Sequence, residues 1–143
     1  MKHSIVLPGQ GKDYAWSKDH VFVKSSSDLS DGRLTLVEDH LKPGFFLARH
    51  HHKKMIETFY ILEGFVEFAF DDETIIAAPG TTLNVPPEVR HEVRCLEGAR
   101  LLTIFSPGGF DRYLEDLVAL TEGQYADAGF MRSLSERYDI FEG

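Results

Sequence analysis

The sequence predicts an all-β protein, an antiparallel sandwich or barrel, followed by short C-terminal helices. Segments rich in Phe, Ile, Val and Thr recur at short intervals between turns that contain Gly, Pro or Asp. Many short strands at such spacing are typical of a β-sandwich or barrel. After residue 109 the apolar residues instead follow a helical period. With 143 residues we expect one domain over 1–143, with the barrel at about 20–106 and the helical segment at about 109–140.

The individual elements follow from the same patterns. The first 20 residues are irregular, and a strand begins at 21–23 and ends in the polar run 25–32, which is interpreted as a loop. Further strand-like segments lie at 33–41, 44–52, 55–62, 65–70, 73–78, 82–86, 90–96 and 100–105. A helix that begins at Phe110 is predicted to pack outside the barrel, to form a dimer contact or to cap one mouth. A second helix is predicted from about Ala126 to Tyr138.

Four side chains form a set that suits a divalent metal. His50 and His52 lie two residues apart, Glu57 follows on the next predicted strand, and His91 begins a later one. First-row transition metals bind imidazole nitrogens, often together with one carboxylate oxygen. A carboxylate inside a barrel is costly unless it is paired or bound to a cation, which favours a ligand role for Glu57.

Strand alternation predicts which side chains share the inner face with these residues. On the first strand we expect Phe46 and Ala48 on the side of the histidines, with Arg49, His51 and Lys53 toward solvent. The other two strands are expected to turn inward Glu57, Phe59, Ile61, His91, Val93 and Cys95. Phe46, Phe59 and Phe68 are candidates either for a pocket lining or for core packing.

Composition and charge argue against several classes of partner. The net charge of −8 would repel a phosphate backbone, so nucleic acid is not an expected partner. No apolar run is long enough to span a bilayer, and the N-terminus does not resemble a signal peptide, so we expect a cytoplasmic protein without a membrane partner. The single Cys95 can form no internal disulfide and is expected to be a buried thiol.

Around the four candidate ligands the sequence resembles the cupin superfamily. The first cupin motif is matched at Gly44, His50, His52, Glu57 and Gly64, and the second at Gly80, Pro86 and His91. The second motif departs from the family at Glu88, where glycine is usual, and at Cys95, where asparagine is usual. The short segment 65–79 between the motifs is similar to that of small single-domain bacterial cupins, and residues 14–22 and 106–110 resemble quercetin 2,3-dioxygenase-like proteins.

The resemblance implies a jelly-roll β-barrel, or double-stranded β-helix, with a divalent transition metal held by His50, His52, Glu57 and His91. The metal would be Fe, Ni, Mn, Co, Cu or Zn. An oxygenase is implied, a dioxygenase-like oxidoreductase for a small phenolic or enediol-type molecule, with Glu57 as the catalytic residue that takes the substrate's acidic proton.

Two other functions stay open from the sequence. One is a non-redox metal-dependent isomerase, cyclase or hydrolase, and the other is a non-catalytic small-molecule-binding cupin. Small cupins commonly pair, so the resemblance also implies a homodimer. The N-terminal apolar residues Tyr14, Trp16, Val21 and Phe22 could supply an exchanged strand to it.

Overall fold

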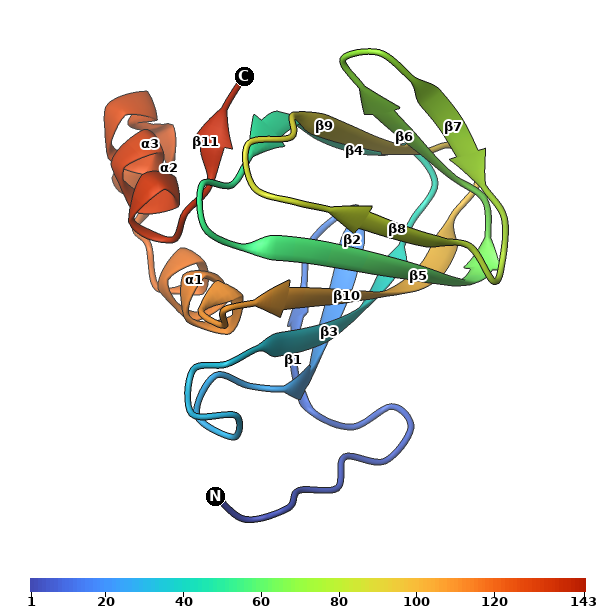
Figure 1. Ribbon diagram of the computed structural model, residues 1–143. Coiled ribbons are helices and arrows are strands. Elements are labelled where there is room, and N and C mark those ends of the chain that lie inside the picture. The colour runs from blue at the N-terminus through green and yellow to red at the C-terminus, as the bar shows by residue number, and fades with distance from the viewer.

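Two antiparallel sheets form the body of the protein in the computed structural model, which describes residues 1–143 (Figure 1). The first sheet contains, in spatial order, β1 (Lys12–Ala15), β2 (Asp19–Ser25), β3 (Thr35–Leu41), β10 (Ala99–Ser106), β5 (Ile56–Gly64) and β8 (Thr82–Val85). The second contains β11 (Phe141–Glu142), β4 (Phe45–His51), β9 (His91–Cys95), β6 (Val66–Phe70) and β7 (Thr74–Ala77). The all-β prediction is confirmed, and the sheets enclose a jelly-roll barrel.

The core between the sheets follows the predicted alternation on β5 and β9. Glu57, Phe59 and Ile61 are buried on β5, and every second residue of β9 is buried, beginning at His91. Ile61 and Phe68 are completely shielded from solvent. Burial of an apolar side chain of this size stabilises the fold by about 1.5–3 kcal/mol. Strands β5 and β9 therefore direct the side chains of Glu57 and His91 into the interior of the barrel.

Strand β4 differs from the predicted alternation. Phe45 and Leu47 pair with inward residues of β9, but the next pair joins His50 to His91, because the register shifts between Leu47 and His50. An extra residue in one strand reverses the side to which the following side chains point. Phe46 is therefore 52% exposed rather than on the side of His50, which corrects the expectation for this residue and for Ala48, also exposed.

The termini contain elements that the sequence did not reveal. Strand β1 lies within the segment expected to be irregular, and it pairs with β2 through Tyr14, which is only 6% exposed. Because Tyr14 is the only buried residue of β1, the sequence of this strand shows no alternation of apolar and polar residues. Strand β11 at the C-terminus pairs with β4 through Phe141 and His51.

Three helices lie together at one end of the barrel (Figure 1). Helix α1 (Phe110–Val118) begins where it was predicted, and α3 (Ala128–Arg137) confirms the second predicted helix, whereas α2 (Glu122–Ala126) was not predicted. Two caps define where α2 and α3 begin. Thr121 and Gln124 form a capping box at α2, and the Asp127 side chain accepts a hydrogen bond from the Phe130 N–H at the start of α3. No helix of the protein combines the length and apolarity that a bilayer crossing requires.

Candidate metal centre

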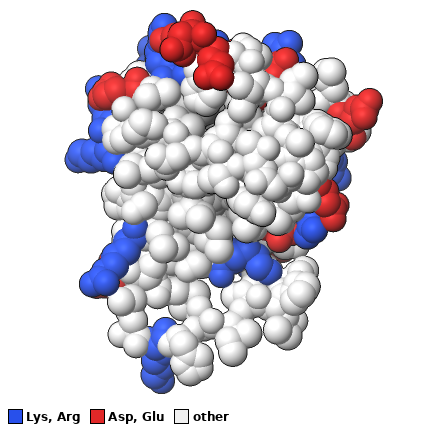
Figure 2. All heavy atoms as spheres, turned by 45° about the vertical axis from the view of Figure 1, so that its right-hand side comes forward, with Lys and Arg blue, Asp and Glu red and all other residues white.

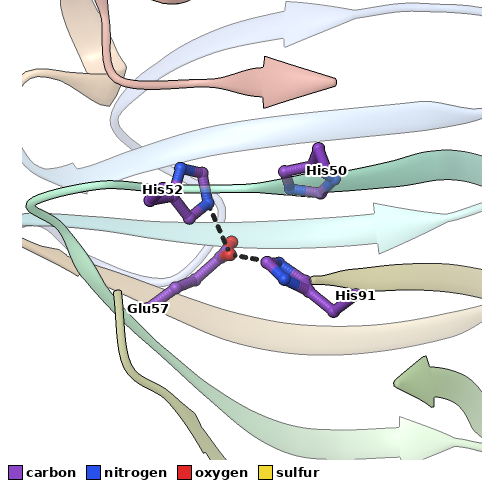
Figure 3. A group of neighbouring side chains, drawn as sticks. All are labelled: His50, His52, Glu57 and His91. Carbon is purple, nitrogen blue, oxygen red and sulfur yellow. Dashed lines mark hydrogen bonds and ion pairs between the residues drawn. The ribbon is translucent and has the colours of Figure 1, made fainter. Parts of the chain in front are cut away.

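The four side chains singled out in the sequence lie together inside the barrel (Figure 3). Each offers one potential ligand atom, and these atoms lie within 4.8 Å of one another. His50 comes from β4, His52 from the turn that follows, Glu57 from the start of β5 and His91 from the start of β9. All four are buried. A group of this composition could hold a metal ion.

The topology explains how these residues meet. His50 and His91 are direct cross-strand partners on β4 and β9 of the second sheet. Glu57 lies in the first sheet, where it pairs with Phe105 of β10 and Val85 of β8. The chain crosses from one sheet to the other between β4 and β5, and His52 lies in that crossing. The centre therefore joins both walls of the barrel.

The imidazole rings are oriented from behind by backbone carbonyl groups. The Nδ1 atoms of His50 and His91 lie 2.9 Å and 3.0 Å from the carbonyl oxygens of Ala48 and Val89. That of His52 lies 2.7 Å from the carbonyl oxygen of residue 139. A carbonyl oxygen can only accept, so each Nδ1 carries the proton. The Nε2 atoms are then free to act as ligands, an arrangement typical of metal-binding histidines.

The Glu57 carboxylate occupies the space between two of these Nε2 atoms. Its Oε1 lies 3.1 Å from His52 Nε2 and 2.9 Å from His91 Nε2 (Figure 3). With the proton on Nδ1, a neutral imidazole presents a lone pair at Nε2, and two acceptors at this separation require a cation between them. A proton on the ring or a divalent metal meets that requirement, so the donor set fits a metal.

The protonation states also suit a metal. Burial would raise the pKa of Glu57, but the hydrogen bonds with His52 and His91 outweigh it and hold that pKa at about 2. Burial, together with the charge of His91, lowers the pKa of His50 to about 4. At neutral pH this leaves an ionised carboxylate and a neutral His50 imidazole, the forms that bind metals.

A cavity of about 580 Å³ opens beside the centre, lined mainly by apolar side chains. Helix α1 covers part of it with Phe110, Tyr113, Leu114 and Leu117, so the helix caps one mouth of the barrel, as one of its three predicted positions required. Phe59 lines the cavity, as do His50, His52 and Glu57, whereas Phe68 belongs to the core. Phe46 also contributes to the lining, although it is half exposed. Cys95 is a buried core thiol, as predicted.

The sequence did not identify Asp139, which connects the C-terminal segment to the centre. Its backbone carbonyl accepts the hydrogen bond from His52 Nδ1. Its carboxylate accepts hydrogen bonds from the backbone N–H groups of Lys53, Lys54 and Met55, at 2.8–2.9 Å. The residue has a φ of 65°, a left-handed conformation in which Asp is enriched among non-glycine residues. Asp139 thus fixes both the ring of His52 and the turn that carries it.

Glu88 shows how the chain tolerates its departure from the second cupin motif. It has a φ of 71°, in the left-handed region that favours glycine. Its N–H donates to the His52 carbonyl oxygen at 2.7 Å. The turn therefore keeps the backbone conformation that a glycine would adopt, and the neighbouring His91 keeps its place.

Comparisons with known proteins agree with this architecture. Residues 37–105 match a family model described as a cupin domain. No curated protein matches the chain in sequence. Among solved structures, KdgF from Halomonas sp. superposes with a TM-score of 0.68 at 18% identity, covering 76% of this chain and 99% of that one.

Two further solved structures have a similar fold but names that point to different reactions. The polyketide cyclase RemF from Streptomyces resistomycificus has a TM-score of 0.66 at 18% identity, covering 73% of this chain and 80% of its own. Ectoine synthase from P. lautus also has a TM-score of 0.66 at 18% identity, covering 81% and 85%. A shared fold at this identity does not select a reaction. The protein therefore has the cupin fold, and its residues 37–105 match the cupin domain model.

Proposed function

We propose that the protein is a metal-dependent oxygenase for a small phenolic or enediol-type molecule, with His50, His52, Glu57 and His91 as the metal ligands. The observation that carries this proposal is the position of the buried cluster in the wall of a largely apolar cavity. A bound divalent metal supplies open coordination positions for substrate oxygens and for dioxygen, and it acts as a Lewis acid or redox centre. The four proposed metal ligands therefore lie beside an apolar space that the substrate could occupy.

The residues of the chain divide the remaining work. Phe59 and Phe105 line the cavity next to the cluster and can pack against an aromatic ring, while α1 limits access of water. Glu57 is the proposed proton acceptor for the substrate hydroxyl.

The same geometry supports a second function, a non-redox isomerase, cyclase or hydrolase in which Glu57 moves a proton beside a polarised carbonyl group. The similarity in fold to a polyketide cyclase and to ectoine synthase favours it as the alternative. A cupin that binds a small molecule without catalysis is the third possibility. Turnover with Zn²⁺ and without oxygen would favour the second function, and ligand binding without turnover the third.

Elemental analysis of the purified protein, followed by oxygen-electrode assays with flavonols and catechols, tests the proposal. We expect about one redox-active metal per chain and its loss in His50→Ala and His91→Ala. His51→Gln is the matched control, because His51 lies between two proposed ligands in sequence but outside the cluster. Absence of metal after reconstitution would contradict the ligand assignment. Bound metal without oxygen uptake on any diol would contradict the oxygenase.

We also propose that the chain forms a homodimer. Tyr14 and Val21 lie buried in the paired strands β1 and β2, which stay a candidate for exchange between two chains. The outer side of β10, β5 and β8 is a second candidate. Its exposed residues include Ile56, Tyr60 and Ile104, and none of its outward side chains over 56–60, 102–106 and 82–85 is charged. Figure 2 likewise shows a broad uncharged area, with charged side chains gathered around its margin.

A further inference from the structure

Two carboxyl groups that the metal centre does not use lie in the wall of the same cavity. They belong to Asp19 at the start of β2 and Asp39 on β3, and we call them the acid pair. The Oδ2 of Asp39 accepts a hydrogen bond from Thr103 Oγ1 at 3.0 Å. The Oδ1 of Asp19 is shielded from solvent, and no N–H or O–H group of the protein donates to it. The pair therefore retains hydrogen-bonding capacity that the protein does not satisfy.

No cationic side chain of the protein forms an ion pair with the acid pair. Two basic residues also line the cavity, but both have partners elsewhere. Lys18 Nζ donates to the carbonyl oxygen of Pro43 at 3.1 Å, and Arg49 donates to Asp71 at 2.7 Å. An apolar wall with two carboxyl groups and no cation is costly unless something else supplies positive charge or protons.

When no ligand is bound, bound protons reduce the negative charge of the acid pair. Burial raises the pKa of Asp19 far above its ordinary value, and the negative charge of Asp39 raises it further. Burial also raises the pKa of Asp39, and the Glu57 carboxylate adds to this increase while His40 opposes it. At neutral pH the two groups therefore hold one proton between them, and the pair carries a single negative charge.

We propose that the acid pair is a second subsite of the cavity, which binds the protonated amine of a substrate whose oxygen atoms are held at the metal centre. This inference rests on the proposed function for its second half. A primary ammonium group offers three N–H donors and a positive charge, enough for the undonated Asp19 Oδ1 and for Asp39 together. As the ammonium binds, the shared proton leaves to solvent, so both carboxylates become ionised and one cation replaces another. A hydroxyl group offers one donor and no charge and cannot release the proton.

The lining between the two polar ends defines the rest of the substrate. Phe59, Leu101 and Phe105 line the same cavity, so the part of the molecule between its oxygens and its amine is apolar or aromatic. The expected substrate class is an arylalkylamine or a similar amine with vicinal oxygen atoms.

Calorimetric titration of the zinc-loaded protein tests the subsite without turnover. The first pair of probes is phenethylamine and 2-phenylethanol, which lack chelating oxygens and differ only in the amine. We expect phenethylamine to bind at least about tenfold tighter, as a charged donor does against a neutral one. Titration in two buffers of different ionisation enthalpy should show about one proton released per amine bound, because the shared proton leaves.

Variants assign the effect to the acid pair. Asp19→Asn and Asp39→Asn should each abolish the preference for the amine and the proton release. Asp13→Asn is the matched control, because Asp13 is an exposed carboxylate on neighbouring β1 that contacts His20. Thermal unfolding of each variant shows that loss of binding is not loss of fold. Equal affinity of the amine for the wild type and both cavity variants would overturn the subsite, as would binding without proton release.

A second pair of probes, dopamine and 4-ethylcatechol, tests whether one molecule uses both ends. Dopamine should bind about tenfold tighter than 4-ethylcatechol, and Asp39→Asn should remove the difference. A requirement of the acid pair for the binding of phenethylamine, together with dopamine that binds no tighter than 4-ethylcatechol, would contradict the inference that one molecule occupies both the metal centre and the acid pair. If neither catechol requires the metal, the proposed function fails, while the phenethylamine result still decides the subsite.

Discussion

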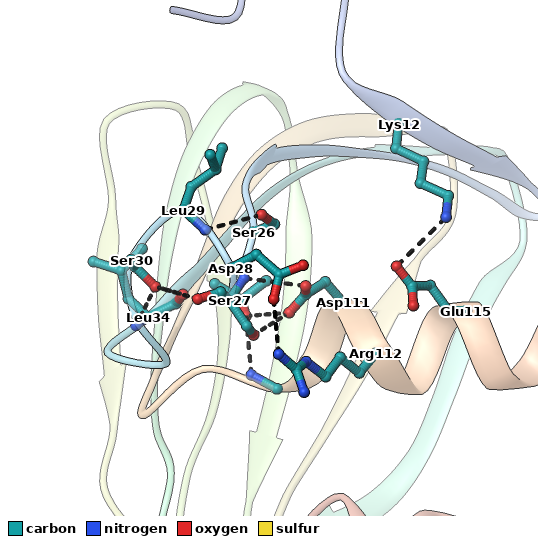
Figure 4. A network of polar contacts seen from close by, with 12 residues as sticks. Lys12, Ser26, Ser27, Asp28, Leu29, Ser30, Leu34, Asp111, Arg112 and Glu115 are labelled. Carbon is teal, nitrogen blue, oxygen red and sulfur yellow. Dashed lines mark hydrogen bonds and ion pairs between the residues drawn. The ribbon is translucent and has the colours of Figure 1, made fainter. Parts of the chain in front are cut away.

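Replacement of Asp111 by Asn should loosen helix α1 over the cavity. Asp111 lies in the first turn of α1 and is only 5% exposed. Its carboxylate accepts hydrogen bonds from the Ser27 N–H at 3.1 Å, from Ser27 Oγ and from Thr35 Oγ1 at 2.8 Å (Figure 4). Asn keeps the shape of the side chain but has one acceptor oxygen, and its amide N–H groups would face donors.

The expected cost follows from the contacts that are lost. Hydrogen bonds to a charged acceptor contribute about 1.5–3 kcal/mol each, and a donor left unpaired in a buried place adds to the loss. If the amide side chain of the Asp111→Asn variant retains one of these bonds, the free energy of unfolding should fall by about 3 kcal/mol. For a urea m-value of about 2 kcal/mol/M, the midpoint then moves down by roughly 1.5 M.

The loss should depend on pH in a defined direction. Burial would raise the pKa of Asp111, but the hydrogen bonds from Ser27 and Thr35 outweigh it and hold the pKa below its ordinary value. A carboxyl whose pKa is lower in the folded state contributes stability above its unfolded pKa of about 3.9 and loses it as the pH falls through the folded value. The difference between wild type and Asp111→Asn should therefore be full at pH 7 and shrink below about pH 4.

Urea unfolding at pH 7 and at pH 3, in chelator-treated protein, measures both effects. Glu115→Gln is the control on the same helix, since Glu115 is exposed and meets only Lys12, at 3.4 Å. An exposed pair of this kind contributes within about 1 kcal/mol. A loss in Asp111→Asn no larger than in the control, or one of equal size at both pH values, would refute the role given to the buried carboxylate.

Three further outcomes are expected. Asp139→Ala should weaken metal binding by about 10–100-fold in a competition titration, because the turn that carries His52 loses its anchor, and unchanged affinity would remove Asp139 from the centre. Asp19→Asn should raise the melting temperature more at pH 8 than at pH 4, because burial raises the pKa of Asp19 and the folded wild type loses stability as the pH rises from the unfolded value; a uniform change would contradict this. Light scattering should give twice the 16.2 kDa of one chain, and a dimer that persists in Ile104→Asp would exclude the uncharged sheet face as its interface.

The alternation over residues 57–61 of β5 and over β9 could be predicted because the register does not shift at these residues and each strand has one buried side. Glu57, Phe59 and Ile61 then follow from a period of two. On β4 the same rule put Phe46 on the wrong side, because the register shift near residues 48–49 reverses the pattern. His50 and His52 were nevertheless placed correctly, since both lie beyond the shift. A bulge leaves little trace in composition, so a local period cannot locate it.

The residues that the sequence did not reveal act over long separations. Asp139 meets the turn at 53–55 only because α2 and α3 return the chain to β4, and nothing near Asp139 indicates that contact. Asp39 did leave a signal. It occupies an inward position of β3, in line with the buried Val37 and Leu41, where an apolar residue is expected. A charged residue that breaks an otherwise apolar alternation is a better indicator of a site than its residue type alone.

Different segments of the chain supply the proposed metal ligands and the remaining wall of the cavity. All four proposed metal ligands fall within residues 37–105, the part that matches the cupin family model. Trp16 and Asp19 enter the cavity from the N-terminal side of that segment, and Phe110 and Tyr113 enter from the C-terminal side. Because these flanking residues line the cavity beyond the proposed metal ligands, they can change with the substrate while the ligands stay fixed. Proteins with this fold and the same ligand set can therefore act on different molecules, and the substrate that we propose for this protein should be sought through the side chains of β2 and α1.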